Sequence, residues 1–67
     1  MLKDAIKTID QLIDGIDDAR KTLPFECSRA DLVDEEAIQG LVADMEGALT
    51  TDEAAEAERY LRLKVAA

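Results

Sequence analysis

Apolar side chains recur at intervals of three and four through the first 23 residues. On a helix with 3.6 residues per turn, this spacing gathers them on one face and leaves lysines and aspartates on the other. The residue before a proline is disfavoured in the helical conformation, so Pro24 ends the element. The pattern predicts one amphipathic helix over residues 2–23. Its apolar positions are Leu2, Ala5, Ile6, Ile9, Leu12, Ile13, Ile16, Ala19 and Leu23.

Two further helices are predicted in the second half of the chain. Asp34 suits an N-cap and is followed by two glutamates, whose charge the helix dipole favours, so a helix is expected over residues 34–49, with Gly47 as an alternative C-terminal end. Thr50 and Glu53 have the spacing of a capping box, which predicts a third helix over residues 51–65. One continuous helix from Asp34 onward is the alternative, and the break at Thr50 argues against it.

Residues 24–33 connect the first two predicted helices. Ser28 and Asp31 have the spacing of a cap for a short turn, which is a weak signal. Three side chains of this connection are too apolar for a free loop, and we expect them to fold back over the end of the bundle as a lid. They are Phe25, Leu32 and Val33.

The composition limits the core that the chain can build alone. Sixty-seven residues form one domain, and they include one Phe, one Tyr and no Trp. One Cys and no His exclude an intrachain disulfide and a structural zinc site. The wide Leu/Ile face of residues 2–23 also exceeds the small, alanine-rich face of residues 51–65. We therefore predict an all-α bundle of two to three antiparallel helices, completed by dimerisation. The residues expected to self-associate are Leu2, Ile6, Ile9, Leu12, Ile13 and Ile16.

The charge is strongly acidic, with 16 Asp and Glu against 8 Lys and Arg, a net charge of −8. Direct binding to nucleic acid or to an anionic membrane needs clustered basic residues, so neither is expected. Between Arg29 and Arg59 the chain has ten carboxylates and no base. These carboxylates form either a solvated surface or a surface that meets a basic partner. No secretory signal and no membrane-spanning run is apparent, and an unpaired Cys fits a reducing compartment, so we expect a cytoplasmic protein.

No residue pattern indicates catalysis. Without histidine, no Ser-His or Cys-His pair exists. Cys27 lies two residues from Arg29, whose charge would favour a reactive thiolate; the alternative is an incidental loop cysteine. The aspartates at positions 14, 17 and 18 lie within a periodic helix and lack the spacing of a calcium loop. We therefore expect no enzyme activity, cofactor or metal site.

Two functional hypotheses remain. The first is a non-enzymatic interaction module, such as a small regulator, inhibitor or adaptor, that docks helices against another protein. The alternative is an acidic mimic of nucleic acid that blocks a basic cleft on a nucleic-acid-binding protein. Apolar residues outside the helical stripes are the candidate contacts to a partner. Two of them have an alternative role within the fold: Phe25 could cap the core, and Tyr60 could pack against the first helix. The candidates are Phe25, Tyr60 and Leu63.

Overall fold

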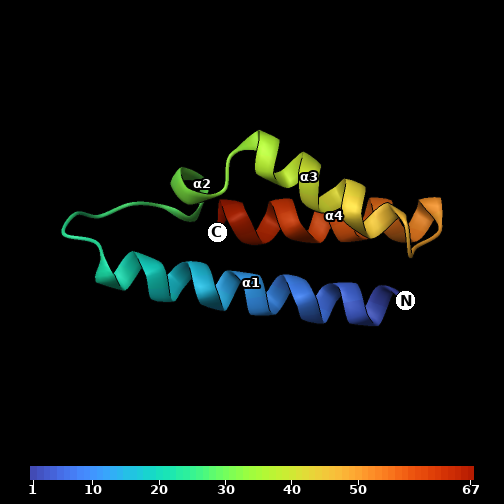
Figure 1. Cartoon of the computed structure of the whole chain (residues 1–67), viewed down its shortest axis with the longest axis horizontal. Helices are drawn as coiled ribbons and strands as arrows, with labels where there is room; N and C mark the ends of the chain where they lie inside the picture. Colours follow the sequence, from blue (N-terminus) through green and yellow to red (C-terminus); the bar gives the residue numbers. More distant parts are fainter.

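The computed structural model describes all 67 residues as four helices without a strand (Figure 1). The helices are α1 (Leu2–Thr22), α2 (Arg29–Leu32), α3 (Glu35–Glu46) and α4 (Thr51–Ala66). The all-α prediction is confirmed, and α1, α3 and α4 are the three helices that the sequence predicts. The single turn of α2 is an addition to the predicted two to three helices. None of the four combines the length and the apolar character needed to cross a membrane.

Three of the four helices begin at local capping signals, whereas α1 has no side-chain cap. Asp34 caps α3, and Thr50 forms the predicted capping box of α4 with Glu53. A second capping box, between Ser28 and Asp31, begins α2. The weak Ser-Asp signal therefore marks a real helix start, because the two reciprocal hydrogen bonds satisfy backbone groups that a helix end leaves unpaired.

The end of α3 differs from the predicted boundary. The helix stops at Glu46 rather than at residue 49, and Gly47 is its C-cap. Thr50 must be extended to act as the N-cap of α4, and its φ and ψ are −68° and 165°. The residues from Gly47 to Leu49 therefore form the turn between the two helices, and the break at Thr50 excludes one continuous helix.

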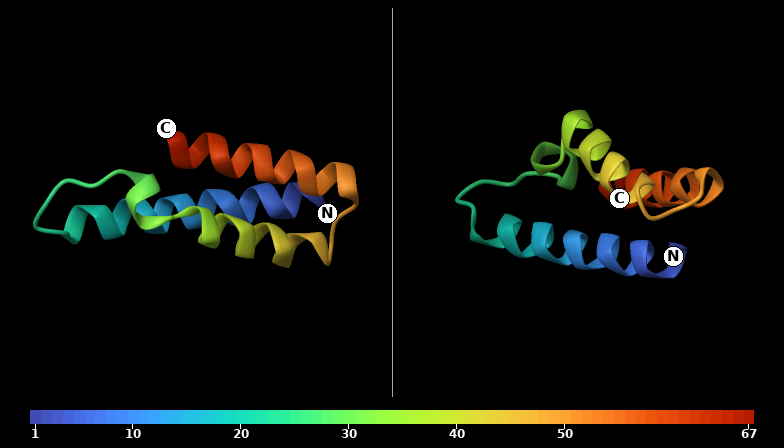
Figure 2. Two further views of the ribbon diagram at one scale, coloured as in Figure 1. Left: turned by 90° about the horizontal axis from the view of Figure 1, so that it is seen from above. Right: turned by 45° about the vertical axis from the view of Figure 1, so that its right-hand side comes forward.

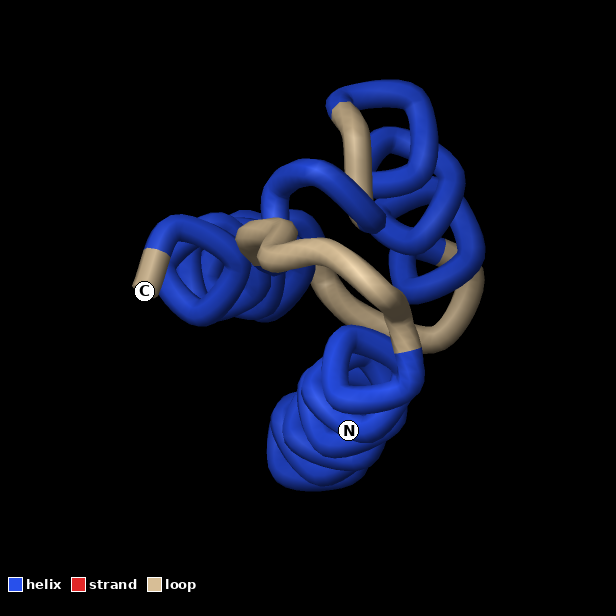
Figure 3. The backbone as a smooth tube through the Cα atoms, turned by 90° about the vertical axis from the view of Figure 1, so that its left-hand side faces the viewer, coloured by secondary structure: helices blue, strands red, loops and turns tan.

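Helix α4 lies at the centre of the fold, and both α1 and α3 pack against it (Figures 1 and 2). Its Ala57 and Leu61 are fully buried. Viewed along the long axis, α1, α3 and α4 lie at the corners of a triangle (Figure 3). The structure is therefore a compact helical bundle in which α1 and α3 pack mainly on α4 rather than on each other.

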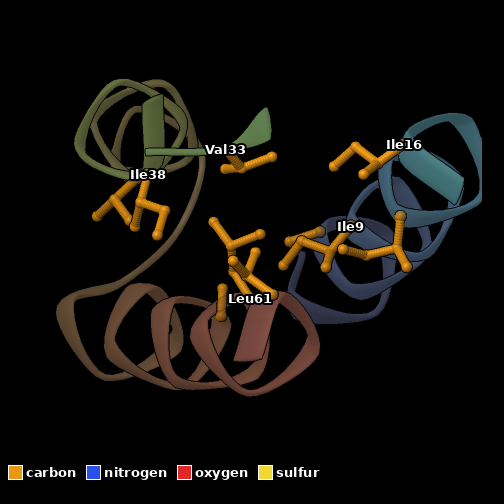
Figure 4. Packing of buried hydrophobic residues seen from close by; sticks show 10 residues of the cluster. Ile9, Ile16, Val33, Ile38 and Leu61 are labelled. Carbon is orange, nitrogen blue, oxygen red and sulfur yellow. The ribbon is translucent and has the colours of Figure 1, made fainter. Parts of the chain in front are cut away.

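Helix α2 and Val33 fill the space between α1 and α3 at one end of the molecule. Val33 is 7% exposed and lies among Ile16 of α1, Ile38 of α3 and Leu61 of α4 (Figure 4). The helix itself packs against both α1 and α4. The predicted lid is thus confirmed at Val33.

The same prediction is wrong for Phe25 and Leu32, which are 62% and 42% exposed. The backbone is already extended at Leu23, the C-cap of α1, so the following loop runs past the end of that helix (Figure 1). Arg20 Nε donates a hydrogen bond of 2.8 Å to the carbonyl of Cys27, which holds the loop there. Val33 alone then covers this end of the core.

Candidate functional site: the groove between α1 and α3

An apolar groove of about 400 Å³ separates α1 from α3 at the end of the molecule opposite α2. Eight of its eleven lining residues are apolar, and they include both methionines of the chain. Methionine side chains are flexible and polarisable, so they adapt to partners of different shape. The lining residues are Met1, Asp4, Ala5, Thr8, Ile9 and Leu12 beside α1, and Leu41, Asp44, Met45, Ala48 and Leu49 beside α3.

The groove exists because the chain fills the space between α1 and α3 at one end only. Beside Ile16, Val33 and α2 occupy this space. Beside Ile9, no segment of the chain takes the corresponding position, and Leu41 and Met45 are only half-buried.

The closed end is held by a polar cluster around Arg29. Its Nε and Nη2 donate hydrogen bonds of 2.9 and 2.7 Å to the two carboxylate oxygens of Asp17. Its Nη1 donates a third, of 2.8 Å, to the carbonyl of Lys64 in α4. The Arg29 guanidinium, supported by Arg20, lowers the pKa of Asp17 from 3.8 to about 2. One side chain therefore fixes α2 against both α1 and α4.

Polar contacts join α4 to both helices that carry the groove walls. The hydroxyl of Tyr60 donates a hydrogen bond of 2.5 Å to Asp10 of α1. On the other side, Arg62 binds both carboxylate oxygens of Glu35 at 2.7 and 2.8 Å, and it also binds Glu58. No hydrogen bond or ion pair joins α1 to α3 directly. The width of the groove is therefore set through α4.

The charged side chains at the groove are acidic on both walls. Asp4 lies on α1 and Asp44 on α3, and both are exposed. Neither carboxylate takes part in an ion pair. No Lys or Arg lines the groove, and the hydroxyl of its one other polar residue, Thr8, donates to the carbonyl of Asp4. The groove thus presents an apolar floor between two unpaired negative charges.

The residues predicted to self-associate fall into two groups. Ile9, Ile13 and Ile16 are buried within the single chain, whereas Leu2, Ile6 and Leu12 are half-buried. Ile9 and Leu12 line the groove. Self-association through these residues stays a prediction, because burial within one chain does not show whether a second copy contacts them.

The three predicted partner contacts are not brought together in one site. Phe25 lies in the loop after α1, and Leu63 is 68% exposed on α4. Tyr60 packs against the core, and its hydroxyl donates a hydrogen bond to Asp10. The ammonium of Lys64 lies 5.3 Å from the centre of its ring. Tyr60 therefore has the structural position against the first helix that the sequence also suggested.

The sequence analysis missed the groove itself. Leu41 and Met45 of α3, and Leu49 in the turn that follows it, line the groove and are only half-buried. The available signal was the mismatch between two helices with large apolar side chains and a central helix whose inward face begins with Ala54 and Ala57.

The chemistry of the remaining surface gives no competing site. No three side chains of Cys, Asp or Glu converge as metal ligands would. Cys27 is half-buried beside an open hollow at the loop, and the nearby Arg29 is bound to Asp17 and to the carbonyl of Lys64. Comparison of the chain with protein-family models, curated proteins and solved structures finds no match.

Proposed function

We propose that this protein is a non-enzymatic interaction module whose groove between α1 and α3 receives an amphipathic helix of another protein. The observation that carries the proposal is the one-sided filling of the space between these helices. Val33 and α2 occupy it beside Ile16, and nothing covers the half-buried apolar residues beside Ile9. Helices with apolar residues at positions i, i+3, i+4 and i+7 bind grooves of this kind.

The lining favours a helix over a small molecule. A volume of about 400 Å³ falls within the range of small-molecule sites, but such sites also contain several converging polar groups that orient the ligand. Here the polar lining consists of Thr8 and two carboxylates, Asp4 and Asp44. An apolar helix face needs no such groups. From Asp4 to Leu12, α1 advances about 12 Å, so the groove accommodates two to three turns of a docked helix.

Homodimerisation, which the sequence analysis predicts, would compete with this function if a helix from a second copy occupied the same groove. The wide face of α1 that motivated that prediction is partly used within one chain, where Ile9, Ile13 and Ile16 are buried. We therefore propose a different protein as the partner. Sedimentation equilibrium distinguishes the two, because the monomer has a mass of 7.3 kDa.

The alternative function, mimicry of nucleic acid, rests on the ten carboxylates between Arg29 and Arg59. Five of them have partners within the fold: three cap helices and two bind Arg62. They are Asp31, Asp34, Glu35, Glu53 and Glu58. A large part of the acidic surface therefore serves folding, and we place helix docking first.

A synthetic helix tests the proposed docking. The probe is a labelled Leu/Gln peptide of about 14 residues, with Leu at one helical stripe and Gln elsewhere, about 21 Å long when helical. The double variant Thr8→Gln/Ala48→Gln places longer side chains in the groove at two exposed positions. We expect the peptide to bind the wild type, and the variant to lose at least about tenfold in affinity, or about 1.4 kcal/mol.

The matched control is Ala19→Gln/Ala43→Gln, which changes one exposed residue of α1 and one of α3 outside the groove. It should bind the peptide like the wild type, with unchanged helicity in all three proteins. Equal affinity of the groove variant and the control, or no binding by the wild type, would refute docking in this groove.

A further inference from the structure

We infer that the helix received by the groove is cationic, with Lys or Arg on both sides of its apolar stripe. This inference rests on the proposed docking function and adds the chemistry of the partner. Asp4 on one wall and Asp44 on the other are exposed, lie beside the apolar lining and have no ion-pair partner. A helix seated between them would bring basic side chains to both.

Apart from the N-terminal ammonium of Met1, the rest of the groove contains no group that would pair with an acidic helix. No Lys or Arg lines it, and the remaining polar group, the Thr8 hydroxyl, already donates to a backbone carbonyl. Like charges at such a contact disfavour the wrong partner, and opposite charges also accelerate association. The net charge of −8 has the same effect at longer range.

The same charges argue against a second copy as the occupant. Helix α3 contains no basic residue. Helix α4 has three basic residues in its second half. Arg62 is bound to Glu35 and Glu58, and Lys64 lies over the ring of Tyr60, which leaves Arg59 as its one exposed base without an ion pair. Neither of these helices offers a free apolar stripe with bases on both sides. A cationic helix from another protein therefore fits the groove better than α3 or α4 of a second copy.

Three peptides with the same Leu positions test the inference. The remaining positions are Gln, Lys or Glu, giving Leu/Gln, Leu/Lys and Leu/Glu peptides. We expect the wild type to bind Leu/Lys most tightly and Leu/Glu most weakly. Raising the salt concentration from about 50 to about 500 mM should reduce the difference between them, because it screens exposed charges.

A charge-matched pair of variants separates the groove from the overall charge. Asp4→Asn/Asp44→Asn removes the two wall carboxylates, and Glu36→Gln/Glu56→Gln removes two exposed carboxylates outside the groove. Two exposed ion pairs together contribute a factor of about five in affinity. We therefore expect Leu/Lys binding to weaken about fivefold in the first variant and less than about twofold in the second.

The outcomes distinguish this inference from the docking proposal. Equal binding of all three peptides to the wild type would overturn the cationic partner and leave helix docking intact. Equal weakening of Leu/Lys binding in the two variants would also overturn it, since attraction would then come from overall charge. If none of the peptides binds, the docking proposal fails as well.

Discussion

Arg29 and Asp17, twelve residues apart, form a two-point ion pair that fixes the short helix α2 between α1 and α4. The Arg29 side chain is 19% exposed, and its third hydrogen bond goes to the carbonyl of Lys64 near the end of α4. Two parallel hydrogen bonds to a carboxylate are stronger and more directional than a single ammonium contact. This pair holds α2 at the filled end of the space between α1 and α3.

Replacing Arg29 should loosen α2. In Arg29→Gln the carboxylate of Asp17 loses both hydrogen bonds from this side chain, so we expect lower thermal stability and faster amide exchange across residues 29–33. Lys21→Gln is the control, because Lys21 is 78% exposed and 3.9 Å from Asp18. Identical melting temperatures and exchange rates for the two variants would mean that the Arg29 cluster does not hold α2.

The stability of the fold should fall in acid over a defined range. Arg29 lowers the pKa of Asp17 from 3.8 to about 2, and Arg62, with Gln39, lowers that of Glu35 from 4.5 to about 2. A pKa that is lower in the folded state stabilises the fold above the unfolded value, and the contribution disappears as the pH falls through the folded value. Stability should therefore drop between pH 4.5 and about 2.

The double variant Asp17→Asn/Glu35→Gln isolates these two carboxylates. Compared with the wild type, it should be less stable at pH 7 and should lose less stability between neutral pH and pH 2, as followed by circular dichroism melts. An acid dependence as steep as that of the wild type would place the titrating groups elsewhere.

Two leucines of α4 that are two residues apart should respond very differently to truncation. Leu61 is fully buried in the core, and Leu63 is 68% exposed. Leu61→Ala should cost about 2–5 kcal/mol, a large part of the stability of so small a domain. Leu63→Ala should stay within about 0.5 kcal/mol. Urea unfolding measures both, and a large loss at Leu63 would show that its side chain is covered.

The phenol of Tyr60 should titrate above its usual pKa. The hydrogen bond to Asp10 is the main cause that raises the pKa of Tyr60 above 10.0, and burial of the phenol is the second cause. The higher folded value stabilises the fold below the unfolded pKa, and the contribution is lost as the pH rises through the folded one. Tyr60 is the only Tyr and the chain has no Trp, so phenolate absorbance reports this group alone.

The variant Asp10→Asn removes the charge that opposes ionisation of the phenol. Its titration midpoint should lie below that of the wild type, and Asp14→Asn, another exposed change on α1, should leave the midpoint unchanged. Equal midpoints in wild type and Asp10→Asn would refute the contact between Tyr60 and α1.

Much of the fold could be predicted because its signals are local. The stripe of α1 and the caps at Asp34 and Thr50 depend on residues within a few positions of one another, and the helices begin there. Arg29 belongs to a different class, since its partners are 12 and 35 residues away. A sequence of ten carboxylates around few bases does not specify which acid a particular Arg will bind.

The groove could not be predicted for a related reason. Periodicity assigns Leu41 and Met45 to the apolar face of their helix, but it does not determine whether that face is covered. The answer depends on Val33, which fills only one end of the space, and on the small side chains of α4. The sequence analysis identified the mismatch between the helices and assigned its resolution to a second copy.

The central claim is that a helix binds between α1 and α3, and the methionine methyl groups test it most directly. Met1 and Met45 are the only methionines, and both line the groove. In protein carrying ¹³C-labelled methionine methyls, addition of the Leu/Lys peptide should shift both signals to saturation in the wild type, with much smaller shifts at the same peptide concentrations in Thr8→Gln/Ala48→Gln. Peptide binding that leaves both signals of the wild type unmoved would contradict the account.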